Sequence, residues 1–354
     1  MRRALAIIAA ILMIGGAFLF RARADSKQAD AVDEANRPTG TLVCTPELAP
    51  VCDQLHKANP TLSTRVEEAG VTYAALTDPK ATRDGAKIDA WLAPQPWPAM
   101  VDEQRKTASL DPMFGDASKV LARSPIVTVI AKDRLAVLQH FCPGGTVDWK
   151  CVGQVASKPW TDAGGEASWG AVKPGHGAPD KSASGLFTFA QATGQYLAST
   201  DYARNDLADG NYRLWAHQLE QGLPTFSPSA GSAVAQMVSF GRSSFDVAGA
   251  IEANAGPLIA GSREKANLSI LYPAPVATAD VVLVPLRGSD PGGRMKQLLE
   301  SSQGQEALGQ SGWRVDGQPT VAGVDATVVL DPQKTNVPRA GVMLALRDVW
   351  SQVK

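Results

Sequence analysis

The sequence lacks the short motifs that identify most nucleotide-using and hydrolytic proteins. No Gly-Lys pair occurs, which excludes a P-loop, and neither H-E-x-x-H nor G-x-S-x-G is present. Gly175-His176-Gly177 has Asp180 where a Rossmann fingerprint needs its third glycine. The S-x-x-K match at 262–265 has neither an S-D-N nor a K-T-G partner. With no nucleophile and base at a recognisable spacing, the sequence predicts a non-enzyme that uses no metal or cofactor.

Cysteine is also scarce, with four residues arranged as two local pairs, Cys44 with Cys52 and Cys142 with Cys151. Four cysteines can pair in three ways, and a Pro-Gly-Gly turn between Cys142 and Cys151 favours the local pairing. Pro50, tolerated at a helix start, would let Cys52 fold back towards Cys44. A metal site is the weaker alternative, because the four histidines show no ligand spacing.

The chain has a single long apolar run, Ala4 to Phe20, which follows Arg2 and Arg3. Such a run is either a signal-peptide core or a short membrane span. An A-x-A cleavage site stands at 22–24, but charged residues at 21 and 23 precede Asp25 and favour an uncleaved anchor. Both interpretations place the body outside the cytoplasm.

Basic and acidic side chains nearly balance, with 34 of the first and 35 of the second, so the net charge is −1. The leader holds four arginines and no acid, so the body without it carries −5. An acidic body argues against nucleic acid as a partner. Aromatic residues make up only 6% of the chain, which predicts cores built from small aliphatic side chains.

What the sequence does contain is a body that alternates strands and helices after a polar linker. Its 354 residues suffice for two lobes. Strand-like segments lie at 40–44, 63–66, 87–93, 124–132, 169–173, 268–272 and 280–286. Helical segments separate most of them, which predicts an α/β protein with a mostly parallel sheet.

A Gly/Pro-rich turn leads into Ser182, Ser184 and Gly185, which open an amphipathic helix. A helix that opens in this way presents unpaired N–H groups and hydroxyls, with the positive end of its dipole behind them. This segment therefore predicts a binding site for a polar or anionic group.

Six segments in order resemble the type 2 extracytoplasmic solute-binding proteins that serve ABC importers. They are GTLVCTPELAPVCDQL, IDAWLAPQPWPAM, ARSPIVTVIAKDR, KPGHGAPDKSASGL, LSILYPAP and GQEALGQSGWRV, and they span Gly40 to about Val315. More narrowly, the chain resembles the branch of molybdate-like oxyanion binders and solute-binding domains fused to von Willebrand A modules.

The resemblance implies an α/β fold with two lobes, crossing hinge strands and a ligand cleft between the lobes. It assigns 1–24 to the signal or anchor, 25–39 to a linker, 40–123 and 268–330 to lobe 1, 124–267 to lobe 2 and 331–354 to a C-terminal helical extension. The ligand-binding residues that it implies are Thr45, Pro46, Pro96, Trp97, Ser124, Ser182, Ser184, Asp246 and Tyr272. Each of these side chains has an ordinary structural alternative as a cap, a loop hydroxyl or a packed hinge residue.

The chain also departs from the family. The first cysteine, Cys44, lies inside the body, so lipid attachment is not expected. Glu47 would repel an oxyanion unless it points outward. In the C-terminal extension, Leu344, Val349 and Trp350 can form one helical face. This segment resembles the connector before a von Willebrand A module, and the alternative is a terminal helix packed on the body.

Two functions from different classes follow. In the first, the protein captures a small polar or anionic solute, such as an oxyanion, and presents it to an ABC permease. In the second, it is an envelope interaction protein, anchored by its N-terminal segment, that keeps the fold without transport. Both place the protein outside the cytoplasm, either anchored or released by cleavage.

Overall fold

The computed structural model describes residues 38–224, 232–331 and 335–354. The predicted leader and nearly all of the predicted linker lie outside these residues. Within the described part, no helix is both long and apolar enough to span a membrane.

One mixed sheet runs through the whole molecule, in the order β2-β1-β3-β8-β4-β6-β5, with β7 paired to β4. The strands are β1 (Gly40–Cys44), β2 (Leu62–Val66), β3 (Ala90–Gln95), β4 (Ala122–Ala131), β5 (Pro174–Gly175), β6 (Val247–Ile251), β7 (Leu268–Leu271) and β8 (Thr278–Pro285). The expected mostly parallel sheet is wrong, because β4 and β8 pair antiparallel with their neighbours. The strand expected at 169–173 is also replaced, by a 3-10 turn over Ala167–Trp169 and by the short β5.

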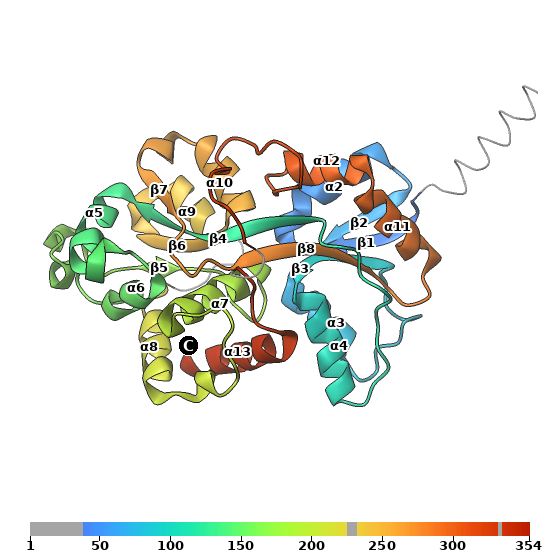
Figure 1. The fold of residues 1–354 in the computed structure, drawn as a ribbon, viewed down its shortest axis with the longest axis horizontal. Coiled ribbons are helices and arrows are strands. Elements are labelled where there is room, and N and C mark those ends of the chain that lie inside the picture. Colours follow the sequence, from blue (N-terminus) through green and yellow to red (C-terminus); the bar gives the residue numbers. More distant parts are fainter. Residues whose placement is uncertain (1–37, 225–231, 332–334) are drawn as a thin grey trace, which may run out of the picture.

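β4 and β8 cross between two halves of the molecule, lobe 1 and lobe 2 (Figure 1). The first residues of β4 pair with β8, from Ala122 opposite Val281 to Pro125 opposite Thr278. Farther along, β4 pairs with β6 and β7 in lobe 2, while β8 pairs with β3 in lobe 1. Buried, β-branched residues such as Val127, Val129 and Ile130 suit β4 to this central place. The two strands therefore form the hinge.

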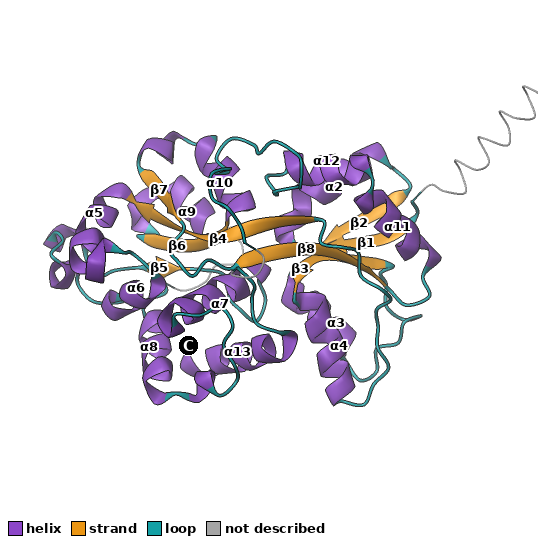
Figure 2. Ribbon diagram, viewed as in Figure 1, coloured by secondary structure: helices purple, strands orange, loops and turns teal. Residues whose placement is uncertain are grey.

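Helices cover both faces of the sheet in each lobe (Figure 2). Lobe 1 carries α2 (Ala49–Ala58), α3 (Ala69–Thr77), α4 (Trp97–Thr107), α11 (Asp290–Glu300) and α12 (Ser302–Gln310). Lobe 2 carries α5 (Lys132–Phe141), α6 (Trp149–Val155), α7 (Ala183–Leu197), α8 (Gly210–Gln221), α9 (Ala233–Phe240) and α10 (Glu252–Ala260). Tryptophan contributes more to the core than the low aromatic content suggested, since five are essentially fully buried: Trp91, Trp97, Trp149, Trp160 and Trp313.

The two local disulfides are present, Cys44–Cys52 and Cys142–Cys151. The first joins the end of β1 to the first turns of α2, as expected from Pro50 at the start of this helix. The second closes the loop between α5 and α6, where Asp148 caps α6 by accepting a hydrogen bond from the Cys151 N–H.

The last helix, α13 (Ala340–Val353), contacts both lobes and packs on α4 of lobe 1 and on α7 and α8 of lobe 2 (Figure 1). Its buried face comprises Met343, Leu346, Val349, Trp350 and Val353. The predicted face included Val349 and Trp350 correctly, whereas Leu344 is only partly buried.

Candidate functional site

The opening of α7 faces lobe 1. Ser182 caps the helix, and its Oγ accepts a hydrogen bond from the Gly185 N–H at 3.1 Å. The backbone N–H of Ser184 donates to Glu47 Oε1 of lobe 1 at 2.8 Å. The Ser182 hydroxyl donates to the same oxygen at 3.4 Å. The structure therefore brings the predicted helix opening of lobe 2 against the predicted entry loop of lobe 1.

Glu47 occupies the position that an anionic ligand of α7 would take. It lies in a 3-10 turn, Pro46–Leu48, and is only 8% exposed. Rather than pointing outward to complement the dipole of its own helix, it complements the dipole of α7 in the other lobe. Its backbone oxygen also accepts a hydrogen bond from Asn254 Nδ2 at 2.9 Å. A negative charge held here opposes the binding of an oxyanion at the same helix opening.

The lobe 1 side of the contact between the lobes carries the other predicted residues of that lobe. Thr45 follows β1, Pro46 begins the 3-10 turn, and Trp97 begins α4 after a cis Gln95–Pro96 bond. Thr45 and Trp97 are both fully buried. Tyr73 of α3 approaches the Trp97 ring edge to face, with centroids 6.1 Å apart and an interplanar angle of 73°. The sequence did not single out Tyr73, although it completes an aromatic pair with Trp97.

Arg347 of α13 covers this aromatic pair. Its guanidinium carbon lies 4.4 Å from the centroid of the Tyr73 ring and 5.2 Å from that of Trp97. Its Nη2 donates to the backbone oxygen of Asp180, in the turn before α7, at 3.1 Å. One side chain from the C-terminal helix thus contacts both lobes.

Several buried polar atoms of the cleft walls have no hydrogen-bond partner among the described residues. They are Thr45 Oγ1, Glu47 Oε2, Trp97 Nε1, Asp180 Oδ1, Asn254 Oδ1 and Arg347 Nε. A buried polar group without a partner costs about 1–3 kcal/mol. Such groups occur on both sides of the contact between the lobes, so a small polar molecule with donors and acceptors would be stabilised there.

The lobes approach closely beside this region. The Gly70 N–H at the start of α3 donates to the Lys181 backbone oxygen at 2.8 Å. A Cβ at position 70 would collide with the Asp180 backbone oxygen, so only glycine permits this contact. The neighbouring Glu68 has its pKa raised to about 7, chiefly by burial and then by the Glu47 carboxylate, while Lys181 opposes the shift.

Three predicted binding residues have their polar atoms bonded within the protein. The Ser124 hydroxyl accepts a hydrogen bond from the Ala253 N–H, and the Tyr272 hydroxyl donates to the buried carboxylate of Glu252. Asp246 is fully buried among three donors of lobe 2, Arg134 Nε, Trp160 Nε1 and the Lys173 N–H. These contacts fit the structural alternative for each residue, as hinge or core groups.

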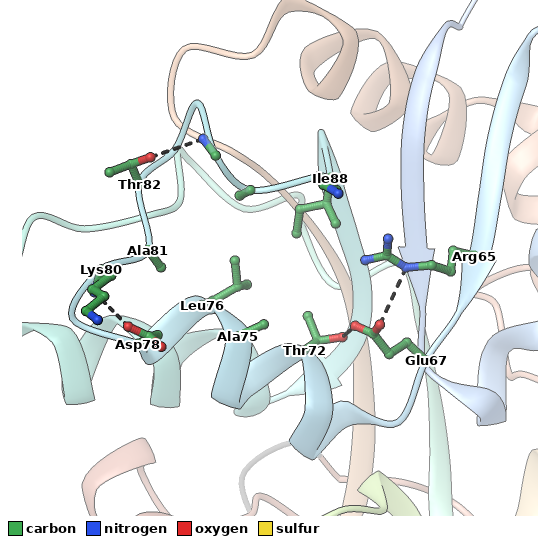
Figure 3. Close-up of a pocket in the computed structure, with 13 residues that line it drawn as sticks. Arg65, Glu67, Thr72, Ala75, Leu76, Asp78, Lys80, Ala81, Thr82 and Ile88 are labelled. Atoms are coloured by element: carbon green, nitrogen blue, oxygen red, sulfur yellow. Dashed lines mark hydrogen bonds and ion pairs between the residues drawn. The ribbon is translucent and has the colours of Figure 1, made fainter.

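Two larger cavities occur among the described residues. A polar cavity of about 500 Å³ lies beside the hinge, between the end of β3, the start of β8, Thr200 and Asp201 of lobe 2, and the segment 336–340. A second, of about 460 Å³, lies wholly in lobe 1 between β2, α3 and the loop 78–88 (Figure 3). There Glu67 accepts a hydrogen bond from Thr72 and pairs with Arg65 at 3.5 Å. Only the first cavity is bounded by both lobes.

Searches of family models and of curated proteins gave no match. Solved structures match over nearly the whole chain. A periplasmic thiamin binding protein has a TM-score of 0.58 and 13% identity, covering 90% of this chain and 96% of its own. Iron-bound HitA from Pseudomonas aeruginosa has a TM-score of 0.57 and 12% identity, covering 88% and 99%. The sulfate-binding protein SubI from Mycobacterium tuberculosis has a TM-score of 0.51 and 15% identity, covering 89% and 97%.

The chain therefore has the two-lobe, type 2 fold of periplasmic binding proteins, as expected from the six segments. At these identities the similarity shows the fold alone, and the ligands of the neighbours differ in charge and size. The site must be argued from its own residues.

Sequence reasoning did not find Tyr73, Asn254 or Arg347. Tyr73 lies inside a helix, at a position where an aromatic residue is usually part of the core. Arg347 is 250 residues from Trp97, and no local pattern indicates that contact. The one sequence feature that pointed to the segment of Arg347 was the C-terminal extension, which departs from the family.

Proposed function

We propose that this protein is an extracytoplasmic solute-binding protein that closes its lobes over a small polar solute and presents it to an ABC permease. One observation carries the proposal: loops of the two lobes meet beside the hinge and bring buried, unpartnered polar atoms to their contact. Opening about β4 and β8 would expose these atoms to a solute, and closure would desolvate it. The proposed role includes no catalysed step.

The position of Glu47 narrows the class of solute that the site can bind. The sequence allowed a polar or anionic solute, and a carboxylate at the opening of α7 disfavours the anion. The narrower resemblance to molybdate-like binders and von Willebrand A-fused domains therefore has no support from this site and remains a prediction. Export by the N-terminal segment, as a cleaved signal or a retained anchor, is part of the proposal and rests on residues 1–24.

Tryptophan fluorescence of the full chain tests the proposal, because Trp97 lies in the cleft wall. Oxyanions, sugars, amino acids and organic amines are titrated to millimolar concentration, and we expect a saturable change with one class. Trp97→Phe should remove most of that change. Trp169→Phe, in lobe 2 beside Trp160, should retain it. If no class binds to the full chain or to a chain ending at residue 338, the proposal is wrong.

A second candidate is an envelope interaction protein that keeps the fold without transport. The specific observation in its favour is that α13 of the same chain lies between the lobes. Capture of the tagged protein from solubilised membranes separates the candidates. Recovery of a permease with its ATPase supports import, whereas recovery of a different assembly supports the interaction role.

A further inference from the structure

Most polar contacts of α13 are made with lobe 2. Trp350 Nε1 donates to the buried Glu220 Oε2 at 2.7 Å, and His217 Nδ1 lies 2.7 Å from the Val353 backbone oxygen. Arg213 Nη1 donates to Gln352 Oε1 at 3.0 Å, and Arg204 Nε donates to the Gly341 backbone oxygen at 2.9 Å. The apolar face of α13 is buried against α4 of lobe 1 and against α7 and α8 of lobe 2. By its polar contacts, α13 thus belongs to lobe 2.

Arg347 makes the contrasting contact, because its guanidinium reaches the aromatic pair of lobe 1. The attraction of a cation to the Tyr73 and Trp97 rings amounts to about 0.5–2 kcal/mol, depending on desolvation. Its Nη2 bonds the Asp180 backbone oxygen, and its Nε has no partner among the described residues. The guanidinium therefore lies between the lobes, in contact with both walls of the proposed solute cleft.

Carboxylates occur on the segments that surround this position. Burial and then the nearby Glu47 carboxylate raise the pKa of Glu68, and the Asp348 carboxylate lies near Tyr73. Lys181 is the opposing positive charge near Glu68. The pair of ring faces and the acceptor oxygen match a planar guanidinium or an alkylammonium group, whereas they offer little to an anion.

We infer that α13 is an intramolecular occupant of the solute cleft, and that the Arg347 guanidinium lies where the cationic group of the solute binds. This inference rests on the proposed function and specifies its solute class, an organic cation with a guanidinium or alkylammonium group. Binding of the solute and docking of α13 exclude each other, because both need the faces of Tyr73 and Trp97.

Removal of the guanidinium tests the solute class. In the full chain carrying Arg347→Ala, methylguanidinium chloride should bind about tenfold more tightly than in the wild type, as measured by isothermal titration calorimetry. Arg347→Lys keeps a cation on the rings and should bind as weakly as the wild type. Arg213→Ala removes a different arginine contact to α13 and should also behave like the wild type. Adding Tyr73→Leu to Arg347→Ala should abolish the gain.

Hydrogen exchange tests the exclusion. A cationic solute at saturating concentration should increase amide exchange over residues 340–353 of the wild-type chain, because α13 leaves the cleft. Agmatine serves as the probe, since it carries both a guanidinium and an ammonium group. Binding of agmatine with unchanged protection of α13 would overturn the exclusion.

The results separate this inference from the proposed function. If sulfate or a sugar binds to Arg347→Ala and methylguanidinium does not, the cationic class is wrong and solute binding stands. If no class of solute binds to the wild type or to Arg347→Ala, both fail. Equal binding of methylguanidinium to Arg347→Ala and Arg347→Lys would show that loosening of α13, and not the vacated ring faces, accounts for the gain, and would overturn the inference.

Discussion

Two buried carboxylates of this protein differ in how completely their oxygens are hydrogen-bonded. Asp246 of lobe 2 accepts hydrogen bonds from Arg134, from Trp160 and from the Lys173 backbone, so both of its oxygens are satisfied. Glu47 has one oxygen bonded to the opening of α7, while the other has no partner among the described residues. The first carboxylate completes a network inside one lobe, and the second lies at a contact between two lobes.

The hydrogen bonding of each carboxylate indicates whether it contributes to the stability of one lobe or to the contact between the lobes. A fully satisfied buried network rigidifies the lobe that contains it. A partly satisfied one is retained at a free-energy cost, which is expected where two bodies separate and a third molecule can intervene. The Asp246 network should therefore govern unfolding of lobe 2, and the Glu47 contact should govern closure.

The largest decrease in the free energy of unfolding should follow removal of the fully hydrogen-bonded Asp246 carboxylate. Asp246→Ala leaves the Arg134 guanidinium buried beside Asp133 alone, and breaking a buried pair in this way costs about 3–5 kcal/mol. Urea denaturation followed by circular dichroism measures the change in the free energy of unfolding. Asp133→Ala is the matched control, because Asp133 is partly exposed and should cost about 1 kcal/mol or less. Equal losses in the two variants would contradict the comparison.

The next effect concerns the helix that spans the lobes. Trp350→Phe preserves the aromatic packing of α13 but removes the donor to Glu220, and should cost about 1–3 kcal/mol because the buried carboxylate loses a partner. Hydrogen exchange should show the loss first in α13. Ser351→Ala, on the exposed side of α13, should change stability by less than about 0.5 kcal/mol. A globally uniform increase in exchange would show that α13 does not detach from the cleft separately.

Much of the fold could be predicted because its signals are local. The uninterrupted β-branched run before Asp133 indicates a central strand, and the spacing of Cys142 and Cys151 around a Pro-Gly-Gly turn indicates a disulfide. The cap at Ser182 was readable for the same reason, since it uses residues three positions apart. The antiparallel hinge was not readable, because strand direction depends on which distant strands pair.

The site was less predictable because its contacts are long-range. Asp246 stands at the end of a loop, where a ligand residue and a buried structural acid look alike in sequence. Only the folded chain shows that Arg134 and Trp160 surround it. Likewise, Glu47 could be identified as an obstacle to an oxyanion, but its bond to a helix 137 residues away could not be inferred.

A smaller loss of stability should follow removal of the Glu47 carboxylate, which covers the opening of α7. Glu47→Ala removes two hydrogen bonds between the lobes, from the Ser184 N–H and the Ser182 hydroxyl, and should cost about 1–2 kcal/mol, less than Asp246→Ala. It also frees the Ser184 N–H, so sulfate should raise the melting temperature of this variant and leave that of the wild type unchanged. Glu306→Ala, on the exposed surface of α12, controls for general salt effects. Stabilisation of all three proteins by sulfate to the same extent would contradict the assignment.

The smallest effect should be a pH dependence of the contact between the lobes. The pKa of Glu68 is raised from 4.5 to about 7, first by burial and then by Glu47, so its protonated form is favoured in the folded chain. The resulting stability is fully present below the unfolded pKa and is lost as the pH rises through about 7. His176 also has a raised pKa, because Glu220 outweighs the opposing effect of burial, and its contribution likewise falls with rising pH. Denaturation midpoints measured from pH 5 to pH 8 should therefore decline in the wild type and decline less in Glu68→Gln, which retains the contribution of His176. A decline of equal slope in the two proteins would show that Glu68 is not part of the interlobe contact, and would leave Glu47 as a carboxylate without a titrating neighbour.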